Sequence, residues 1–207
     1  MQRITMIERV LRQVYGEQPT DDSNITINLV NQWLIDAVAL AAKTCYRDSI
    51  EIDVQSYVNG GFYTTFSSLP IIQYDEFTYR ITLPQIPIGL GKNEGIKLSF
   101  LNSHGHSTYS AVPLSQDQLS FRQLRRRIPD KILFWAESIY LYIESVIPLT
   151  QFTGVVKMIS GGDPTDLTSI LNIPDDYIPV VIEYLTKNLL LQRAQKKDAI
   201  NDGSDTT

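Results

Sequence analysis

The chain has 207 residues, enough for one large domain or for a domain that carries an insertion, and its 43% hydrophobic content argues against wholesale disorder. The net charge of -5 disfavours a surface that grips phosphate backbones indiscriminately. The single cysteine, Cys45, excludes an internal disulfide, and no stretch approaches the ~18 uncharged apolar residues of a membrane helix. We therefore expect a protein that folds in a cytoplasm and has no contact with a membrane.

Two helices are predicted at the N-terminal end. Residues 5–15 place apolar side chains on one helical face, and Gly16 and Pro19 end the helix. Residues 21–24 can cap a second helix over residues 26–44. The apolar face of this second helix is the clearest in the chain, and it carries Ile27, Val30, Leu34, Ala37, Val38 and Ala41. We interpret it as a core face; the alternative is that part of it packs on another subunit.

The middle of the chain changes to a period of two, which is typical of strands. Prolines at 84 and 87 cannot donate ladder hydrogen bonds, so their segment is predicted to be an edge or a loop. A short helix is expected over residues 115–127, and a tight hairpin across Glu137 and Ser138. Strands are predicted over residues 50–54, 62–66, 76–83, 95–101, 108–113, 132–136, 139–143 and 154–159.

The helical period returns over residues 175–195, where Ile182, Leu185 and Leu189 share a face. We therefore predict an α+β fold in which the N- and C-terminal helices pack together as a small bundle, with a mainly antiparallel β-region inserted between them. In this prediction, residues 1–48 and 163–197 form a helical domain and residues 49–162 form an inserted β-rich domain. Residues 198–207 form a flexible acidic tail.

No set of side chains predicts catalysis. His104 and His106 flank one glycine in a polar loop, but they lack the third ligand that a zinc site needs. Cys45 lies near the end of an apolar helix, which favours a packed thiol over a nucleophile. We therefore expect no enzymatic activity, no catalytic residue, no metal and no cofactor.

Acidic residues gather around two expected helix starts, at Asp163 and Asp166 and at Asp175 and Asp176. Paired carboxylates can do acid–base work or bind a cation. Helix capping and compensation of the helix dipole explain the same residues more simply. We interpret them as capping residues.

The strongest charge feature is a group of four arginines, Arg122, Arg125, Arg126 and Arg127. Arg122 and Arg126 are four residues apart and so share one helical face. Such a face can bind phosphates or the carboxylates of a protein partner. Because the chain is acidic, we interpret it as a protein contact, within or between subunits; the alternative is a solvated face. Its possible acceptors include Asp175, Asp176, Asp198 and Asp202.

Nearly the whole chain resembles the head–tail connector, or neck ring, proteins of tailed bacteriophages, particularly short-tailed and crAss-like phages. The N-terminal half of the resemblance lies in ITINLVNQWLIDAVALAAKT and in the Tyr- and Pro-rich middle with LPQIPIGLGKNEGI. The C-terminal half lies in ILFWAESIYLYI and in IPDDYIPVVIEYLTKNLLLQRAQKKDAINDG. The last segment looks like the closing helix and acidic tail of such adaptors.

The resemblance implies a structural virion protein without enzymatic activity. Such proteins form rings, commonly of twelve copies, beneath the portal in the phage neck, and they contact the portal and other neck or tail rings. Double-stranded DNA passes through the centre without sequence-specific binding. A negative chain suits such a channel, so the arginine group is expected at a subunit or portal interface. The alternative is a nucleic-acid-binding protein that uses the Arg122–Arg127 face.

Overall fold

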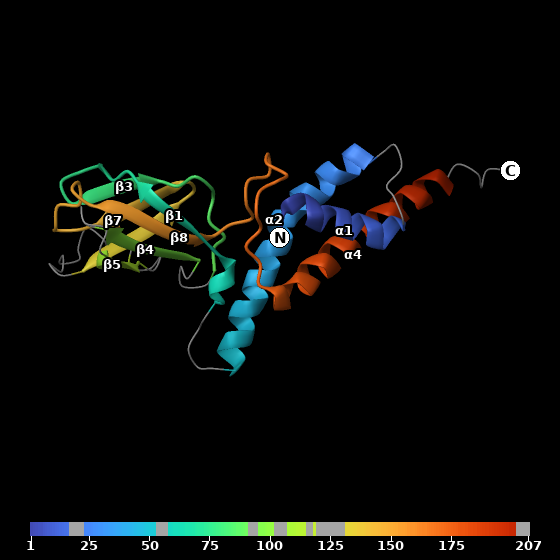
Figure 1. The fold of residues 1–207 in the computed structure, drawn as a ribbon, viewed down its shortest axis with the longest axis horizontal. Helices are drawn as coiled ribbons and strands as arrows, with labels where there is room; N and C mark the ends of the chain where they lie inside the picture. The colour runs from blue at the N-terminus through green and yellow to red at the C-terminus, as the bar shows by residue number, and fades with distance from the viewer. Residues whose placement is uncertain are drawn as a thin grey trace. The chain divides into compact units, whose positions relative to one another are not determined.

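A computed structural model of the chain describes residues 1–16, 23–52, 58–90, 95–101, 107–114, 118 and 131–201. The chain divides into two compact units (Figure 1). A helical unit comprises Met1–Gly61 and Gly161–Thr207, and a β unit comprises Phe62–Ser160. The helical unit is therefore built from both ends of the chain.

Three α-helices form the helical unit: α1 (Arg3–Tyr15), α2 (Ser23–Ile52) and α4 (Ile178–Asn201). The 3-10 turn η3 (Asp175–Tyr177) leads into α4, and a second turn, η1 (Gly60–Phe62), lies at the junction with the β unit. Helix α2 packs against α4, and α1 contacts both. Their shared core is fully buried and includes Met6, Ile7, Val10, Val30, Leu34, Ala37, Ala41, Val181 and Leu185. The apolar periodicity of all three segments predicted these helices.

The prediction of a strand at residues 50–54 is wrong at its start. Helix α2 continues to Ile52, and Ile50 lies on its surface with 46% of its area exposed. Alternation over so few residues also fits a helix surface. Because each residue added to an existing helix gains one hydrogen bond, extending α2 is more favourable than starting a short new strand. Residues 53 and 54 lie outside the described residues.

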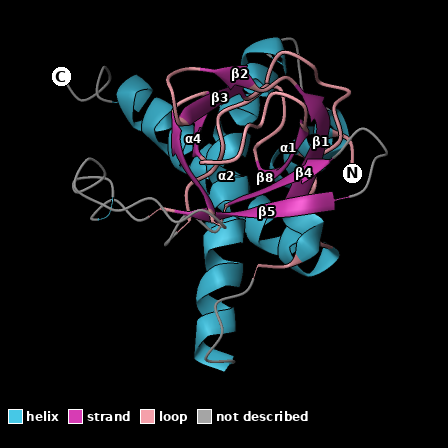
Figure 2. Cartoon of the chain, turned by 90° about the vertical axis from the view of Figure 1, so that its left-hand side faces the viewer, coloured by secondary structure: helices cyan, strands magenta, loops and turns pink. Residues whose placement is uncertain are grey.

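The β unit contains one curled, eight-stranded sheet that forms a half-barrel (Figure 2). Its strands in spatial order are β1-β8-β4-β5-β6-β7-β3-β2. Their bounds are β1 (Tyr63–Leu69), β2 (Ile72–Gln73), β3 (Thr78–Thr82), β4 (Ile96–Leu101), β5 (Ser107–Pro113), β6 (Ile132–Glu137), β7 (Tyr140–Glu144) and β8 (Thr153–Ile159).

The fold class predicted from the sequence is wrong in its description of this sheet. Strands β5 and β6 are parallel, with Val112 opposite Leu133, so the sheet is mixed. A parallel pair needs a long crossover, and residues 114–131 supply one. The fold is therefore mixed α+β. The helix expected at residues 115–127 falls in this crossover, where only Gln118 and the flanking Leu114 and Lys131 are described; Gln118 is helical.

The two faces of the sheet bury different side chains. The main core lies on one face and includes Tyr79, Ile81, Leu98, Phe100, Phe134, Leu141, Ile143, Val156 and Met158. The alternate residues of β6 form a smaller cluster, in which Leu133 and Trp135 pack with Leu114 and with the half-buried Tyr142. The predicted hairpin across Glu137 and Ser138 is confirmed: it joins β6 to β7, and Ser138 adopts a φ of 56°.

Candidate interaction groove on the helical unit

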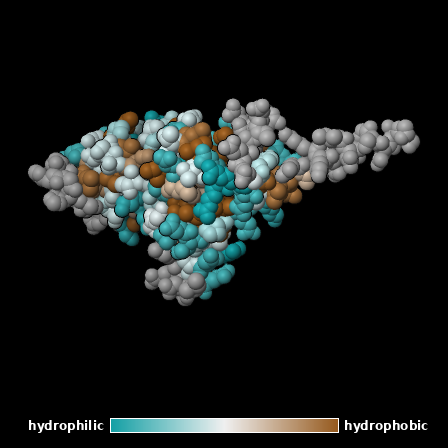
Figure 3. All heavy atoms as spheres, turned by 45° about the vertical axis from the view of Figure 1, so that its right-hand side comes forward, coloured by the Kyte–Doolittle hydropathy of each residue, from teal (hydrophilic) through white to brown (hydrophobic). Residues whose placement is uncertain are grey.

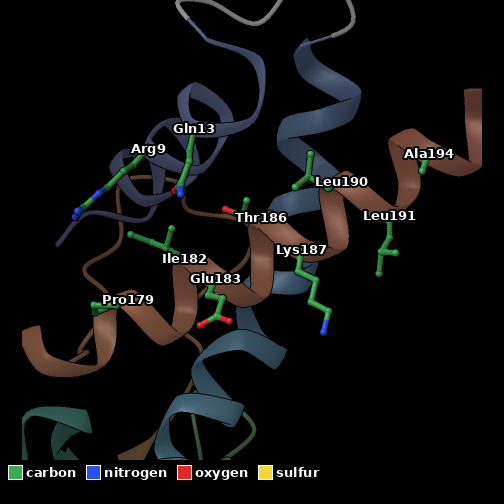
Figure 4. A pocket seen from close by; sticks show the side chains of 10 residues that line it. All are labelled: Arg9, Gln13, Pro179, Ile182, Glu183, Thr186, Lys187, Leu190, Leu191 and Ala194. Atoms are coloured by element: carbon green, nitrogen blue, oxygen red, sulfur yellow. The ribbon is translucent and has the colours of Figure 1, made fainter.

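The helical unit carries an open groove between α1 and α4 (Figure 4). Its volume is about 770 Å³. Helix α1 contributes Arg9 and Gln13, and α4 contributes Pro179, Ile182, Glu183, Thr186, Lys187, Leu190, Leu191 and Ala194. The two leucines of this lining reach solvent, since Leu190 is 47% and Leu191 54% exposed. Apolar residues also reach the surface elsewhere, in patches separated by polar residues (Figure 3).

The groove exists because α4 has more apolar surface than its neighbours cover. Val181, Leu185 and Leu189 form the buried row of α4. Leu190 and Leu191 follow Leu189 directly and point round the helix at about 100° per residue, out of that row. The 24 residues of α4 span about 36 Å, whereas the 13 residues of α1 span about 20 Å. Helix α1 can therefore cover only part of α4.

The polar lining of the groove carries both signs of charge. Arg9 and Lys187 are basic and Glu183 is acidic, and all three are exposed. The Thr186 Oγ1 atom is buried and has no hydrogen-bond partner in the described part of the chain. A mixed rim around an apolar floor fits a protein surface better than a phosphate backbone, which favours a uniformly basic surface.

Of the predicted acidic residues, Asp163 and Asp166 do not start a helix. They lie in residues 160–174, the segment between β8 and η3, which we call the return segment. There the Oδ1 atom of Asp163 accepts hydrogen bonds from the N–H and hydroxyl of Thr165 at 2.8 and 2.7 Å. The Oδ1 atom of Asp166 likewise accepts hydrogen bonds from the N–H and hydroxyl of Thr168. These bonds hold the pKa of both carboxyl groups below the usual value. Their role as helix caps is therefore wrong: they shape two loop turns instead.

Asp175 and Asp176 do lie where a helix begins. They form the first turn of η3, which continues into α4, and both side chains are exposed. Asp198 lies within α4, which runs to Asn201 and so past the expected start of the acidic tail. Asp202, the four arginines Arg122, Arg125, Arg126 and Arg127, and both histidines lie outside the described residues.

Cys45 is a packed thiol, as predicted, with 4% of its surface exposed. It forms a hydrogen bond with Tyr177 of η3. This bond, together with burial and the charges of Asp48 and Asp176, raises the pKa of Tyr177 to about 12. The pair therefore ties α2 to the start of α4.

Sequence reasoning missed a buried arginine at the start of α1. Arg3 is fully buried, and its Nε atom donates to Asn31 Oδ1, its Nη1 atom to the carbonyl of Gly161, and its Nη2 atom to the carbonyl of Asn31. Burial lowers the pKa of the guanidinium, and the nearby Asp163 carboxylate opposes this shift. Arg3 thus holds α1, α2 and the return segment together.

In the described ranges, no three His, Cys, Asp or Glu side chains are grouped so that they could hold a metal ion. Within those ranges, none of the helices has the length and apolar character of a membrane span. No protein-family model matches the chain, and no curated protein matches it.

Proposed function

We propose that the chain is a structural virion protein that assembles into a ring, commonly of twelve copies, and connects the head to the tail of a short-tailed bacteriophage. In this role it lies beneath the portal in the phage neck and contacts the portal and other neck rings, and the genome passes through its centre. It is made in the host cytoplasm. The sequence resemblance supports this proposal, and the observation that carries it structurally is the open apolar groove on α4.

The occupant that we propose for the groove is α2 of a second copy. The inner row of α2 faces the core of its own helical unit, so Leu40 and Ile50 point outward, 40% and 46% exposed. Asp36, Leu40, Lys43, Arg47 and Ile50 follow one another at three- and four-residue spacing on this outer face. We call these five residues the α2 stripe. None of them lines the groove.

Because the groove and the α2 stripe are different surfaces, a contact between them is heterologous, with each copy offering its groove to one neighbour and its stripe to the other. A heterologous contact generates a ring when its rotation closes. The charges also match, since Arg9 can meet Asp36 and Glu183 can meet Lys43 or Arg47. Exposed pairs of this kind guide specificity more than affinity.

Replacing Leu190 and Leu191 together with Asp is expected to break assembly without unfolding the subunit. Both side chains are half exposed, so the free energy of unfolding should fall by only about 1.5–3 kcal/mol, which leaves the subunit folded. Native mass spectrometry should show monomers where the unmodified chain forms a ring. Val146→Asp, at an apolar site in the β unit with 43% exposure, is the matched control and should assemble normally. Rings from the Leu190/Leu191 variant would exclude the groove as the lateral contact.

Phage particles that lack the protein are expected to package DNA but to fail to retain it or to attach tails. A ring beneath the portal closes the exit of the head and offers the tail its docking surface. Counting filled heads by electron microscopy, with and without the gene product, measures this. Infectious particles of normal yield without the protein would refute the proposed role.

A further inference from the structure

The face of the sheet opposite the main core carries an arginine among aromatic rings. Strand pairing places Arg80 of β3 beside Tyr142 of β7, and Tyr142 beside Trp135 of β6. Tyr140 lies two residues away from Tyr142 on β7 and so on the same face, and Tyr74 follows β2 at the edge of the sheet. We call these five residues the Arg80 cluster.

The rings of the cluster fix one another and the guanidinium. Tyr142 stacks on Trp135 with ring centroids 5.3 Å apart and planes 14° from parallel, and Tyr74 meets Tyr142 edge-on at 5.6 Å. The Arg80 Cζ atom lies 4.7 Å from the ring centroid of Tyr140 and 5.6 Å from that of Tyr74. These are cation–π distances, so the rings hold the charge in place.

Arg80 has no acidic partner in the described ranges. Its Nε atom is buried without a hydrogen-bond partner, and its guanidinium forms no ion pair among the described residues. A guanidinium has five N–H donors, and leaving a donor buried and unpaired costs free energy. Cation–π contacts satisfy none of these donors. The group is therefore held ready for an acceptor with two oxygens, such as a carboxylate or a phosphate.

Two adjacent carboxylates also lack a partner in the part of the chain that the structure describes. Asp175 and Asp176 are exposed, and their side chains form no hydrogen bond or ion pair with the described residues. Asp163 and Asp166 differ, because each already accepts two hydrogen bonds from a threonine. Asp175 and Asp176 are also adjacent, so the pair at η3 offers a guanidinium several acceptor oxygens close together on a chain of net charge -5.

We propose that the Arg80 cluster binds the Asp175–Asp176 pair of a second copy of the chain. This inference rests on the proposed ring, in which every subunit meets a neighbour. Tyr74 is 60% exposed and Ile72, opposite Arg80 on β2, is 51% exposed, so they can exclude water from the contact. Tyr, Trp and Arg are the residue types that most often dominate the binding energy of protein interfaces.

A charge exchange tests the pairing. Arg80→Glu alone, and Asp175→Arg with Asp176→Arg, should each raise the protein concentration needed for half-assembly at least tenfold, because like charges then face each other. A chain with all three changes should assemble again. The matched control is Lys97→Glu: Lys97 is an exposed cation 4.8 Å from the Tyr63 ring on the same sheet, and its replacement should leave assembly unchanged.

Sedimentation velocity over a concentration series reads out assembly, and circular dichroism checks the fold. The two aspartates are exposed, so their variant tests the contact even if Arg80→Glu perturbs the sheet. Normal rings from either variant, or no recovery in the triple variant, would overturn the pairing while leaving the proposed ring intact. A monomeric unmodified chain would overturn both. Normal rings together with lost binding to a DNA duplex in Arg80→Glu would assign the cluster to phosphate instead.

Discussion

Replacing Leu34 with Asp is expected to unfold the helical unit. Leu34 on α2 and Leu185 on α4 are both fully buried in the contact between these helices. Losing the leucine contacts costs about 1.5–3 kcal/mol, and an unpaired carboxyl in the core adds several more. Since small proteins are stable by only about 5–15 kcal/mol, most of the stability should be lost. Leu185→Asp should lose a similar share of the free energy of unfolding, measured for both variants by urea titration followed by circular dichroism.

The matched control for this prediction is Leu190→Asp, five residues after Leu185 on α4. Leu190 is 47% exposed, so the same chemical change should cost little there. The change in the free energy of unfolding can then be compared between a buried and an exposed leucine of the same helix. Because the substitution is the same at both, the difference reports the packing of α2 on α4 and not helix propensity. Unfolding midpoints for Leu34→Asp and Leu185→Asp equal to that of the unmodified chain would show that these helices do not pack as described.

Replacing Arg3 with Met should also destabilise the helical unit strongly. The guanidinium joins Asn31 and the Gly161 carbonyl in a fully buried site. Each hydrogen bond to a charged group contributes about 1.5–3 kcal/mol, and methionine would leave these acceptors buried without donors. We expect a loss of about 3–5 kcal/mol in the free energy of unfolding, measured by chemical denaturation.

A double-mutant cycle with Asn31→Ala separates this network from a simple loss of volume. Because Arg3 and Asn31 share their hydrogen bonds, the double variant should lose much less stability than the sum of the single variants. Arg3→Lys should restore only part of the loss, since one ammonium lacks the forked geometry of the guanidinium. Strictly additive losses would mean that Arg3 acts through packing alone.

The helices and most strands could be predicted because local patterns determine them. The spacing of Leu34, Val38 and Ala41 admits one buried face, and the run around Ser138 combines strong strand formers with a turn. The parallel pairing of β5 with β6 could not be predicted in the same way. Alternation along Ala111 to Pro113 is the same in parallel and antiparallel pairs, so the choice depends on the crossover.

The candidate sites depend on contacts between residues distant in sequence, which local patterns do not predict. Nothing near Arg3 indicates that the carbonyls of Leu167 and Ser169 accept the first N–H groups of α1, or that Arg3 is buried beside Gly161. The groove did leave a signal. Leu189, Leu190 and Leu191 are consecutive, and a single buried row on a helix can contain only one of three consecutive residues. The other two leucines therefore have to lie outside that row.

The measurement that tests the central claim most directly is the native mass of the purified full-length chain, alone and mixed with portal protein, over a wide range of concentrations. One subunit has a mass of 23.5 kDa. The proposed ring predicts a single closed species of many subunits, near twelve copies, that forms alone or on the portal and is lost in the Leu190/Leu191 variant. A 23.5 kDa monomer at every concentration, with and without portal, would contradict the proposal.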